Sequence, residues 1–291
     1  MTKQDPASCG SARPIADSIH TVSDMNPDLS DILSEWPYQP GRLNVRLIKG
    51  KNQEPKIQIR LDLGILQMEV EGRPDGHQPF GYGSLLEYYE ARADGAEPPP
   101  DEVDAEEPFS LDERDVRALR EEAAQYYHRY MALLALEDYE GVVRDATRNL
   151  RVLDFVREHA TNDALIQELE PFRPYIMMVR ARAMASQSLR DNEPKAAVVA
   201  IEQGIEALRQ HFDKTGHPEL FEQSNEVAML RDMRESLLPK LPVSQRAELR
   251  QRLQSALEQE NYELAAILRD ELRNLGEDQP GPAPRKDGGQ I

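Results

Sequence analysis

Between residues 109 and 238 the apolar residues recur at helical spacing, and this pattern limits the fold more than any other feature. An example is the set Leu119, Ala123, Tyr126, Tyr130 and Leu133. Steps of three and four residues place such a set on one face of an amphipathic helix. Turn signals at 137–141, 170–174 and 192–194 divide the region. We therefore predict a helical domain of successive helices over residues 109–238.

The first of these helices is expected to begin at a capping box formed by Ser110 and Glu113, and a fifth is expected over residues 218–238. Two of the helices begin at similar turns, at Tyr139 and Pro194, 55 positions apart. Helix pairs opened in this way resemble tetratricopeptide repeats, although a regular array repeats every 34 residues or so. The resemblance leaves two alternatives open, a degenerate repeat and an irregular helical bundle.

A different pattern occupies residues 36–92, where apolar and polar residues alternate in three short runs, at 43–47, 57–63 and 66–70. Strict alternation is typical of strands with one buried face. Loops rich in Gly, Pro and Asn separate the runs, so we predict a three-stranded antiparallel meander. Ser84 and Glu87 then predict the capping box of one helix, which we expect to cover the apolar face of the sheet.

The segments that flank these domains have a different composition. Residues 93–108 contain seven acids, four prolines and no base, which predicts an extended linker. Residues 1–35 and 278–291 are polar and aperiodic, which predicts disordered tails, the first with a short turn of helix near residues 29–33. The predicted fold is α+β and mostly α: a β-meander with one helix, a helical bundle, and a C-terminal helical hairpin.

Composition excludes several classes of protein. The 291 residues carry a net charge of -18 and one cysteine, Cys9, so we expect no internal disulfide and no zinc site of paired cysteines. No apolar run reaches the length of a membrane helix and the start lacks a secretory signal, so we expect a cytoplasmic protein without a membrane partner. The acidic balance disfavours direct binding of nucleic acid.

Residues 36–92 depart from this balance, with eight bases and seven acids. Several of the bases, including Arg46, Lys49 and Lys51, cluster around the loop between the first two predicted strands. Two interpretations remain open: the cluster contacts nucleic acid or an acidic partner, or it faces the acidic linker of its own chain.

The C-terminal segment 249–272 carries the most specific motif. A leucine-spaced helix leads to a turn at Asn261, and the residues that follow are Tyr262, Glu263, Leu264, Ala265, Ala266, Ile267, Leu268, Arg269 and Asp270. This order resembles the UVR motif, which occurs at the C-terminus of the excision-repair protein UvrB, in UvrC, in the McsA kinase activators and in some Clp-type ATPases. The resemblance implies a helical hairpin that mediates pairing between proteins.

The spacing of the residues agrees with this resemblance. Leucine stripes on either side of a hinge at residues 260–261 predict an antiparallel helical hairpin over residues 243–277. So small a hairpin cannot bury its stripes fully, and the adjacent Ala265 and Ala266 let another helix come close. We therefore expect a four-helix arrangement with a second copy or with a partner protein. The alternative is that the hairpin packs only on its own helical domain.

We predict a non-catalytic adaptor or scaffold that binds proteins through this hairpin. The predicted partner-binding residues are Tyr262, Glu263, Ala265, Ala266, Leu268 and Arg269. Tyr262 is expected to fill the cleft between hairpins, the alanines to permit close approach, and Arg269 to pair with an acid of the partner. The alternatives are an accessory factor of excision repair that engages UvrB or UvrC, and a regulator of a Clp-type protease system.

No catalytic residue, metal site or cofactor is predicted. The six histidines show no paired metal spacing, and no phosphate loop or nucleophile elbow occurs. An enzyme with an unrecognised site remains a third alternative. Four tyrosines at 126, 127, 130 and 139 are expected to pack in the core of the helical domain, and the second interpretation is that they line a peptide groove.

Overall fold

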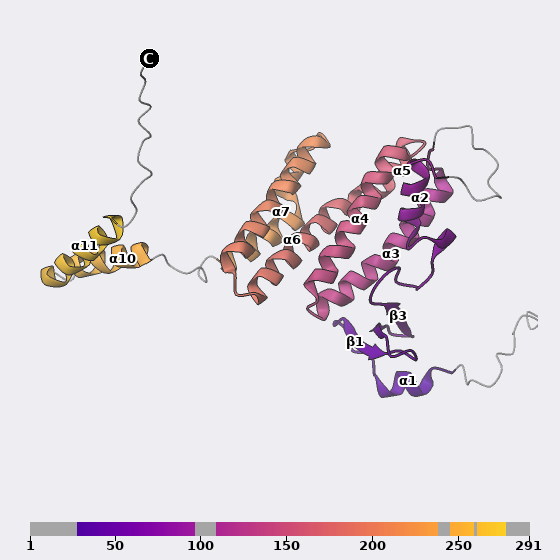
Figure 1. The fold of residues 1–291 in the computed structure, drawn as a ribbon, viewed down its shortest axis with the longest axis horizontal. Coiled ribbons are helices and arrows are strands. Elements are labelled where there is room, and N and C mark those ends of the chain that lie inside the picture. The colour runs from indigo at the N-terminus through magenta and orange to yellow at the C-terminus, as the bar shows by residue number, and fades with distance from the viewer. Residues whose placement is uncertain (1–27, 97–108, 238–244, 259–260, 278–291) are drawn as a thin grey trace, which may run out of the picture. The chain divides into compact units, whose positions relative to one another are not determined.

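The computed structural model describes residues 28–96, 109–237, 245–258 and 261–277. It is mostly helical with one small antiparallel sheet, which confirms the predicted fold class (Figure 1). Most of the predicted tails and of the acidic linker lie outside the described residues. The chain divides into two compact units, with the boundary between Gln78 and Pro79.

The first unit holds a short helix, α1 (Ser30–Glu35), and three strands, β1 (Asn44–Lys49), β2 (Pro55–Arg60) and β3 (Ile65–Glu69). The strands pair antiparallel in the order β1-β2-β3, as the alternating runs predict. The register places six apolar side chains on one face of the sheet, Val45, Leu47, Ile57, Ile59, Leu66 and Met68.

The opposite face of the sheet is mostly polar, with Ile48 and Ile65 as apolar exceptions, and carries a ladder of polar side chains across all three strands. Arg46 Nε donates to Gln58 Oε1 at 2.8 Å, and Gln58 Nε2 donates to Gln67 Oε1 at 2.9 Å. Trp36 stacks on the Arg46 guanidinium, 4.1 Å from its ring centre. These contacts fix the register, because a slip by one residue would exchange the two faces.

The second strand is shorter than the alternation predicts, since it ends at Arg60 and not at residue 63. The Arg60 guanidinium binds the carbonyl oxygens of Trp36, at 2.8 Å, and of Leu61 and Gly64 in the turn that follows. Leu63 lies in that turn and is 88% exposed. Alternation alone cannot locate the end of the strand, because Leu63 continues the apolar pattern into a turn. The hydrogen bonds of Arg60 stabilise that turn.

The second unit begins with the turn η2 (Pro79–Gly81) and the helix α2 (Leu85–Ala93). The Ser84 side chain accepts from Glu87 N as predicted, whereas the Glu87 carboxylate accepts from Gly83 N. We predicted that this helix forms one domain with the sheet, and that domain boundary stays a prediction. The helix belongs to the second unit, where Leu86 is buried among residues of the following helices.

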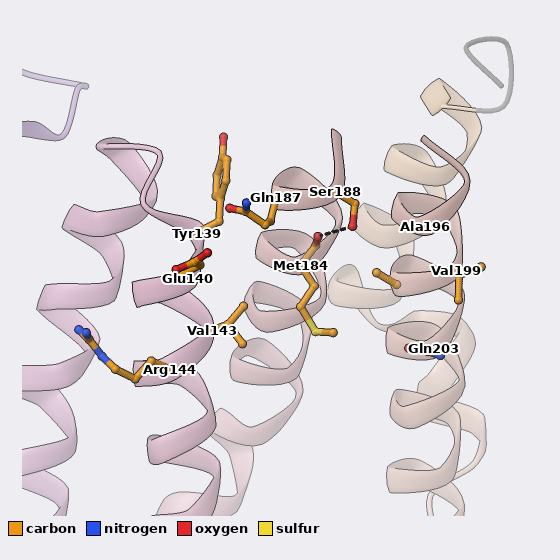
Figure 2. Close-up of a pocket in the computed structure, with 11 residues that line it drawn as sticks. Tyr139, Glu140, Val143, Arg144, Met184, Gln187, Ser188, Ala196, Val199 and Gln203 are labelled. Atoms are coloured by element: carbon orange, nitrogen blue, oxygen red, sulfur yellow. Dashed lines mark hydrogen bonds between the residues drawn. The ribbon is translucent and has the colours of Figure 1, made fainter. Parts of the chain in front are cut away.

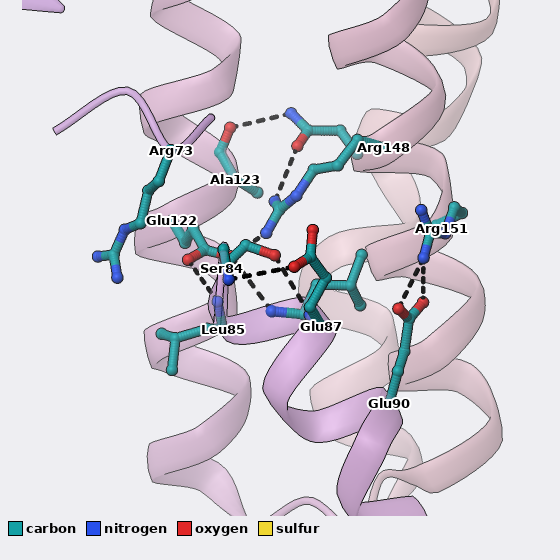
Figure 3. Close-up of polar contacts among 12 residues, drawn as sticks. Arg73, Ser84, Leu85, Glu87, Glu90, Glu122, Ala123, Arg148 and Arg151 are labelled. Carbon is teal, nitrogen blue, oxygen red and sulfur yellow. Dashed lines mark hydrogen bonds and ion pairs between the residues drawn. The ribbon is translucent and has the colours of Figure 1, made fainter. Parts of the chain in front are cut away.

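Polar contacts explain where α2 docks (Figure 3). Glu122, on the helix α3 (Glu113–Ala135), accepts from Leu85 N at 2.8 Å and Leu86 N at 3.3 Å, at the positive end of α2. Arg151, on the helix α4 (Tyr139–His159), pairs with Glu90 at 2.6 Å. Sequence spacing within residues 36–92 could not reveal these partners, because they lie 36 to 61 residues away in the chain.

The capping box of α3 lies two residues beyond the predicted one. Asp115 N donates to Asp112 Oδ1 at 2.9 Å, and Asp112 N donates to Asp115 Oδ2 at 3.1 Å. The prediction with Ser110 and Glu113 is wrong because the chain is still extended at Leu111. There Leu111 N donates to His159 O at 2.7 Å and Leu111 O accepts from Thr161 N at 3.0 Å, so the bridge holds Leu111 in the core.

Three further elements complete the middle of the unit, α5 (Asp163–Leu169), η3 (Glu170–Phe172) and α6 (Arg173–Arg190), and the helix α7 (Pro194–Lys214) follows. The turns before α4 and α7 contain Glu137 and Asn192 in the left-handed conformation. Such short turns make consecutive helices antiparallel neighbours. A Cβ placed on Gly204 would lie 2.4 Å from the Ala181 Cβ, so α6 and α7 approach closely through that glycine.

The predicted fifth helix is two helices, α8 (Glu219–Gln223) and α9 (Asn225–Leu237). They separate at Ser224, which is extended and whose hydroxyl accepts from Val227 N at 3.3 Å. A serine that caps a new helix breaks the old one without any glycine or proline signal. The likeness to tetratricopeptide repeats stays a prediction. No helix in the described ranges is long and apolar enough to span a membrane.

Candidate functional site

The C-terminal hairpin consists of α10 (Gln245–Glu258) and α11 (Tyr262–Glu277), which pack on each other. Asn261 lies between them and forms hydrogen bonds with both helices. Its N–H donates to Ala256 O at 2.8 Å, and its side-chain oxygen accepts from Leu264 N at 3.2 Å. An asparagine suits this position because its short amide side chain caps the N-terminus of the next helix. The predicted hinge therefore coincides with a capping residue.

Small side chains form the interior of the hairpin. Ala256 of α10 is buried with Ala265 and Leu268 of α11, and Leu253 packs against them. Alanines on facing helices allow the two backbones to approach closely, but they remove little apolar surface from water. The hairpin thus has a well-defined contact between its helices and a small core among its described side chains.

The six predicted partner-binding residues divide into two groups. Tyr262, Glu263, Ala266 and Arg269 are exposed, and Tyr262 is 67% exposed. Ala265 and Leu268 instead lie in the hairpin's own interior. Arg269 lies 3.4 Å from the neighbouring Asp270, with both side chains more than half exposed. Ala265 packs against Ala256 within the hairpin, and the close approach of a partner's helix that we expected from the alanine pair stays a prediction.

Three exposed apolar residues of the hairpin were not among the predicted set. They are Leu257, Leu264 and Ile267, and Ile267 is 59% exposed. Leu264 and Ile267 lie three residues apart, so they share one side of α11, next to the buried Leu268. The sequence could have revealed them, because α11 has more apolar positions than the two in every seven residues that contact with one other helix requires.

The helices α2 to α9 of the second unit, called the helical unit below, carry a concave surface between α4, α6 and α7 (Figure 2). The groove has a volume of about 780 Å³, and the apolar residues Val143, Met184 and Val199 line it. Gln187 and Gln203 supply amides at its margin. An adjoining hollow of about 300 Å³ shares Val143, Met184 and Gln203 and reaches Gly204. The groove is thus apolar along its floor and open to one side.

The four tyrosines that the sequence analysis singled out, at 126, 127, 130 and 139, occupy different environments. Tyr126 and Tyr130 are buried, and the guanidinium groups of Arg129 and Arg148 lie 4.8 and 4.1 Å from the Tyr126 ring. Tyr139 lines the groove between α4, α6 and α7. Tyr127 is partly exposed and lines a separate cavity of about 320 Å³. The core interpretation holds for the first pair. Tyr139 lines an open groove, and binding of a peptide there stays a prediction.

One cluster of charged side chains in the helical unit surrounds Glu170. Glu170 accepts from Arg157 at 2.6 Å and from Arg173 at 2.7 Å, and its carboxylate lies 3.8 Å from His211. Burial raises the pKa of Glu170, but these arginines outweigh that effect and hold it below its usual value. Within the described ranges, no three His, Cys, Asp or Glu side chains converge so that they could hold a metal ion.

Comparison with known proteins identifies one region. Residues 244–278 match the family described as the UvrB/uvrC motif, so the chain contains a UVR motif at the hairpin. No curated protein matches the chain, and no solved structure matches it. The helical unit and the sheet are therefore interpreted from their own geometry.

Proposed function

We propose that this UVR-motif protein is a non-catalytic adaptor whose C-terminal hairpin pairs with a cognate hairpin, on another protein or on a second copy. The observation that carries the proposal is the exposed apolar set of the hairpin, Leu257, Tyr262, Leu264 and Ile267. UVR motifs are associated with interactions between proteins, which agrees with such a role. Scattered apolar residues are common on protein surfaces, but four of them on two short helices are not.

Energetics support pairing. The helices have 14 and 16 residues, and isolated helices of about this length are marginal in water. The described interior of the hairpin contributes two alanines and a leucine. A second hairpin packed against Leu264 and Ile267 would turn two helices into a four-helix bundle and remove the exposed apolar surface from water.

The groove between α4, α6 and α7 is the second surface of the proposed adaptor. Apolar side chains, Val143 and Met184, and the amides of Gln187 and Gln203 line this groove. Such a lining suits the binding of a peptide segment better than catalysis. A protein that holds one partner on a hairpin and another in a groove gains avidity through linkage.

The test uses the full chain and its Ile267→Glu variant, with Glu258→Ala as a matched control on the exposed surface of the same hairpin. Sedimentation equilibrium measures self-association, and biolayer interferometry measures binding to purified UvrB and UvrC. We expect wild type and Glu258→Ala to pair in at least one assay. We expect Ile267→Glu to lose about thirty-fold in affinity, since a buried charge at a hot spot costs 2 kcal/mol or more.

Two outcomes would remove the proposal. One is a wild-type chain that stays monomeric at about 100 μM and binds none of UvrB, UvrC and a UVR-bearing Clp ATPase, since that concentration corresponds to an affinity near 5.5 kcal/mol. The other is an Ile267→Glu variant that binds as wild type does, because the exposed apolar set would then play no part.

The motif itself favours a second candidate, an accessory factor of excision repair that engages UvrB or UvrC. Binding to either protein without self-association would support it, and self-association without such binding would support a general scaffold. A regulator of a Clp-type protease system is the remaining candidate of the same kind, and binding to a UVR-bearing Clp ATPase in the same assay would identify it.

A further inference from the structure

We propose that the outer edge of β1 binds an acidic, extended peptide from a partner protein as a fourth antiparallel strand. In the sheet order β1-β2-β3, β1 lies at one edge. Among the residues that the structure describes, no strand pairs with β1 on the side away from β2. Such an edge presents a row of backbone donors and acceptors to a further strand.

The register identifies the outward-facing backbone groups. Gly50 N donates to Glu54 O at 2.7 Å, so the pair at the end of the β1–β2 ladder is hydrogen-bonded. Hydrogen-bonded and non-bonded pairs alternate in an antiparallel ladder. Lys49 therefore belongs to a non-bonded pair, opposite Pro55, which has no N–H. By the same alternation, the backbone groups of Val45, Leu47 and Lys49 point away from β2.

Charge selects the chemistry of the added strand. Residues 36–53 contain four bases and no acid, in a chain whose net charge is -18. The bases are Arg42, Arg46, Lys49 and Lys51. Lysines on an edge strand ordinarily repel unwanted strands. A strand of opposite charge is attracted instead, because acidic side chains on the face of Arg46 would lie beside its guanidinium and the other three bases add a positive field.

Apolar contacts specify the other side of the added strand. Leu47 is 57% exposed at the free edge, on the same face of the sheet as the buried Ile57 and Ile59. A residue placed opposite Leu47 would share that face. Its chain neighbours would point to the opposite face, where Arg46 stacks on Trp36. The fitting sequence alternates acids with β-branched apolar residues.

The sole tryptophan of the chain reports on this site, because Trp36 lies against Arg46. The experiment titrates the full chain with a capped seven-residue peptide of alternating Glu and Val. Trp36 fluorescence and the anisotropy of a fluorescein-labelled peptide are recorded. We expect saturable micromolar binding that weakens as salt is added. Three comparison probes are a Lys-Val peptide, an N-methylated Glu-Val peptide, and labelled oligouridylate.

N-methylation of alternate amides keeps the charge and removes the donors that a fourth strand needs, so we expect at least a tenfold loss of affinity. The Lys-Val peptide is expected not to bind. If the N-methylated peptide binds as tightly as its parent, the site is a diffuse charge patch and the proposal is wrong. It is equally wrong if neither Glu-Val peptide binds, or if oligouridylate binds more tightly than the Glu-Val peptide.

Two substitutions separate the backbone from the side chain. Leu47→Pro removes an outward N–H without touching the β1–β2 hydrogen bonds, and Leu47→Thr keeps that N–H while removing apolar surface. We expect the larger loss from Leu47→Pro, with circular dichroism checking that both variants fold. If Leu47→Pro does not fold, the N-methylated peptide still decides the outcome. The hairpin variant Ile267→Glu is expected to bind the Glu-Val peptide as wild type does, which separates this proposal from that of the adaptor.

Discussion

Arg129 on α3 and Asp145 on α4 form a two-point ion pair inside the helical unit, with Nε–Oδ2 at 2.7 Å and Nη2–Oδ1 at 2.9 Å. Both side chains are 1% exposed. Burial takes both charges out of water, which costs free energy. The bidentate geometry offsets this cost, and Arg144 adds a third contact to Asp145 at 3.0 Å. The contact fixes how α3 and α4 are aligned along their length.

Removing one member of this pair should be far more damaging than removing an exposed pair. We expect Asp145→Ala to lower the free energy of unfolding by about 3–5 kcal/mol, because it leaves the Arg129 charge buried without its carboxylate. Arg117→Ala, which breaks the exposed contact with Glu113, should cost less than about 1 kcal/mol. Urea unfolding followed by circular dichroism measures both, and equal losses would show that burial of the pair is unimportant.

Glu122 should control whether α2 stays docked on α3. Its carboxylate accepts from Leu85 N and Leu86 N and pairs with Arg148. We expect Glu122→Ala to raise the hydrogen-exchange rate of these two amides at least tenfold, since they lose their acceptor at a helix N-terminus. The exposed carboxylate of Glu121 on the same helix provides the control, and Glu121→Ala should leave exchange in α2 unchanged.

The cluster around Glu170 should make the helical unit sensitive to acid. Arginines hold the pKa of Glu170 below its usual value, and burial lowers the pKa of His211. A group whose pKa is lower in the folded state binds fewer protons there, so acidification favours the unfolded chain. Stability should therefore fall as the pH drops below about 6.5 through His211, and again below about 4.3 through Glu170.

Urea unfolding between pH 7 and about pH 3 measures this dependence. We expect His211→Gln to flatten the fall between pH 7 and pH 5, and Glu170→Gln to flatten it at the acid end. His217 is exposed, so His217→Gln serves as the control and should keep the wild-type slope. An unchanged slope in His211→Gln would show that this imidazole gains its proton as easily in the folded state as in the unfolded one.

The adjacent alanines of the hairpin should respond differently to the same substitution. Ala265 is buried against Ala256, whereas Ala266 is exposed. We expect Ala265→Glu to melt the hairpin, because a carboxylate cannot fit between closely packed helices without partners. Hydrogen exchange of the α11 amides should then reach the unprotected rate. Ala266→Glu should keep their protection and affect only binding of a partner, and similar loss of protection in both would contradict the packing.

The sequence located most helices well, because amphipathic periodicity and capping residues are local signals. Asn192 and Pro194 predict the turn and the start of α7, and the structure has both there. The sequence-based prediction was wrong at Leu111, where it began α3 too early, and at Ser224, where it joined two helices into one. At the first, a contact with His159 delays the start of α3, and at the second, a side-chain cap divides a continuous apolar pattern.

In the candidate site, too, local signals were predicted correctly and contacts between helices were not. The order from Tyr262 to Asp270 was sufficient to identify the UVR motif and to place a turn at Asn261. It could not separate Ala265 and Leu268, which face the other helix, from Leu264 and Ile267, which face outward. Positions three or four residues apart on a wide stripe are equivalent until a neighbouring helix selects among them.

By itself, the sequence determined that this chain is mostly helical, that a small antiparallel sheet precedes the helices, and that a UVR hairpin follows them. The spacing of apolar residues and the capping of helices depend on a few neighbouring residues, so both can be recognised from the sequence alone. Only the tertiary structure decided that α2 docks through Glu122, that Arg129 and Asp145 pair, and which faces remain open. Those outcomes depend on residues far apart in the chain, whose proximity no local pattern encodes.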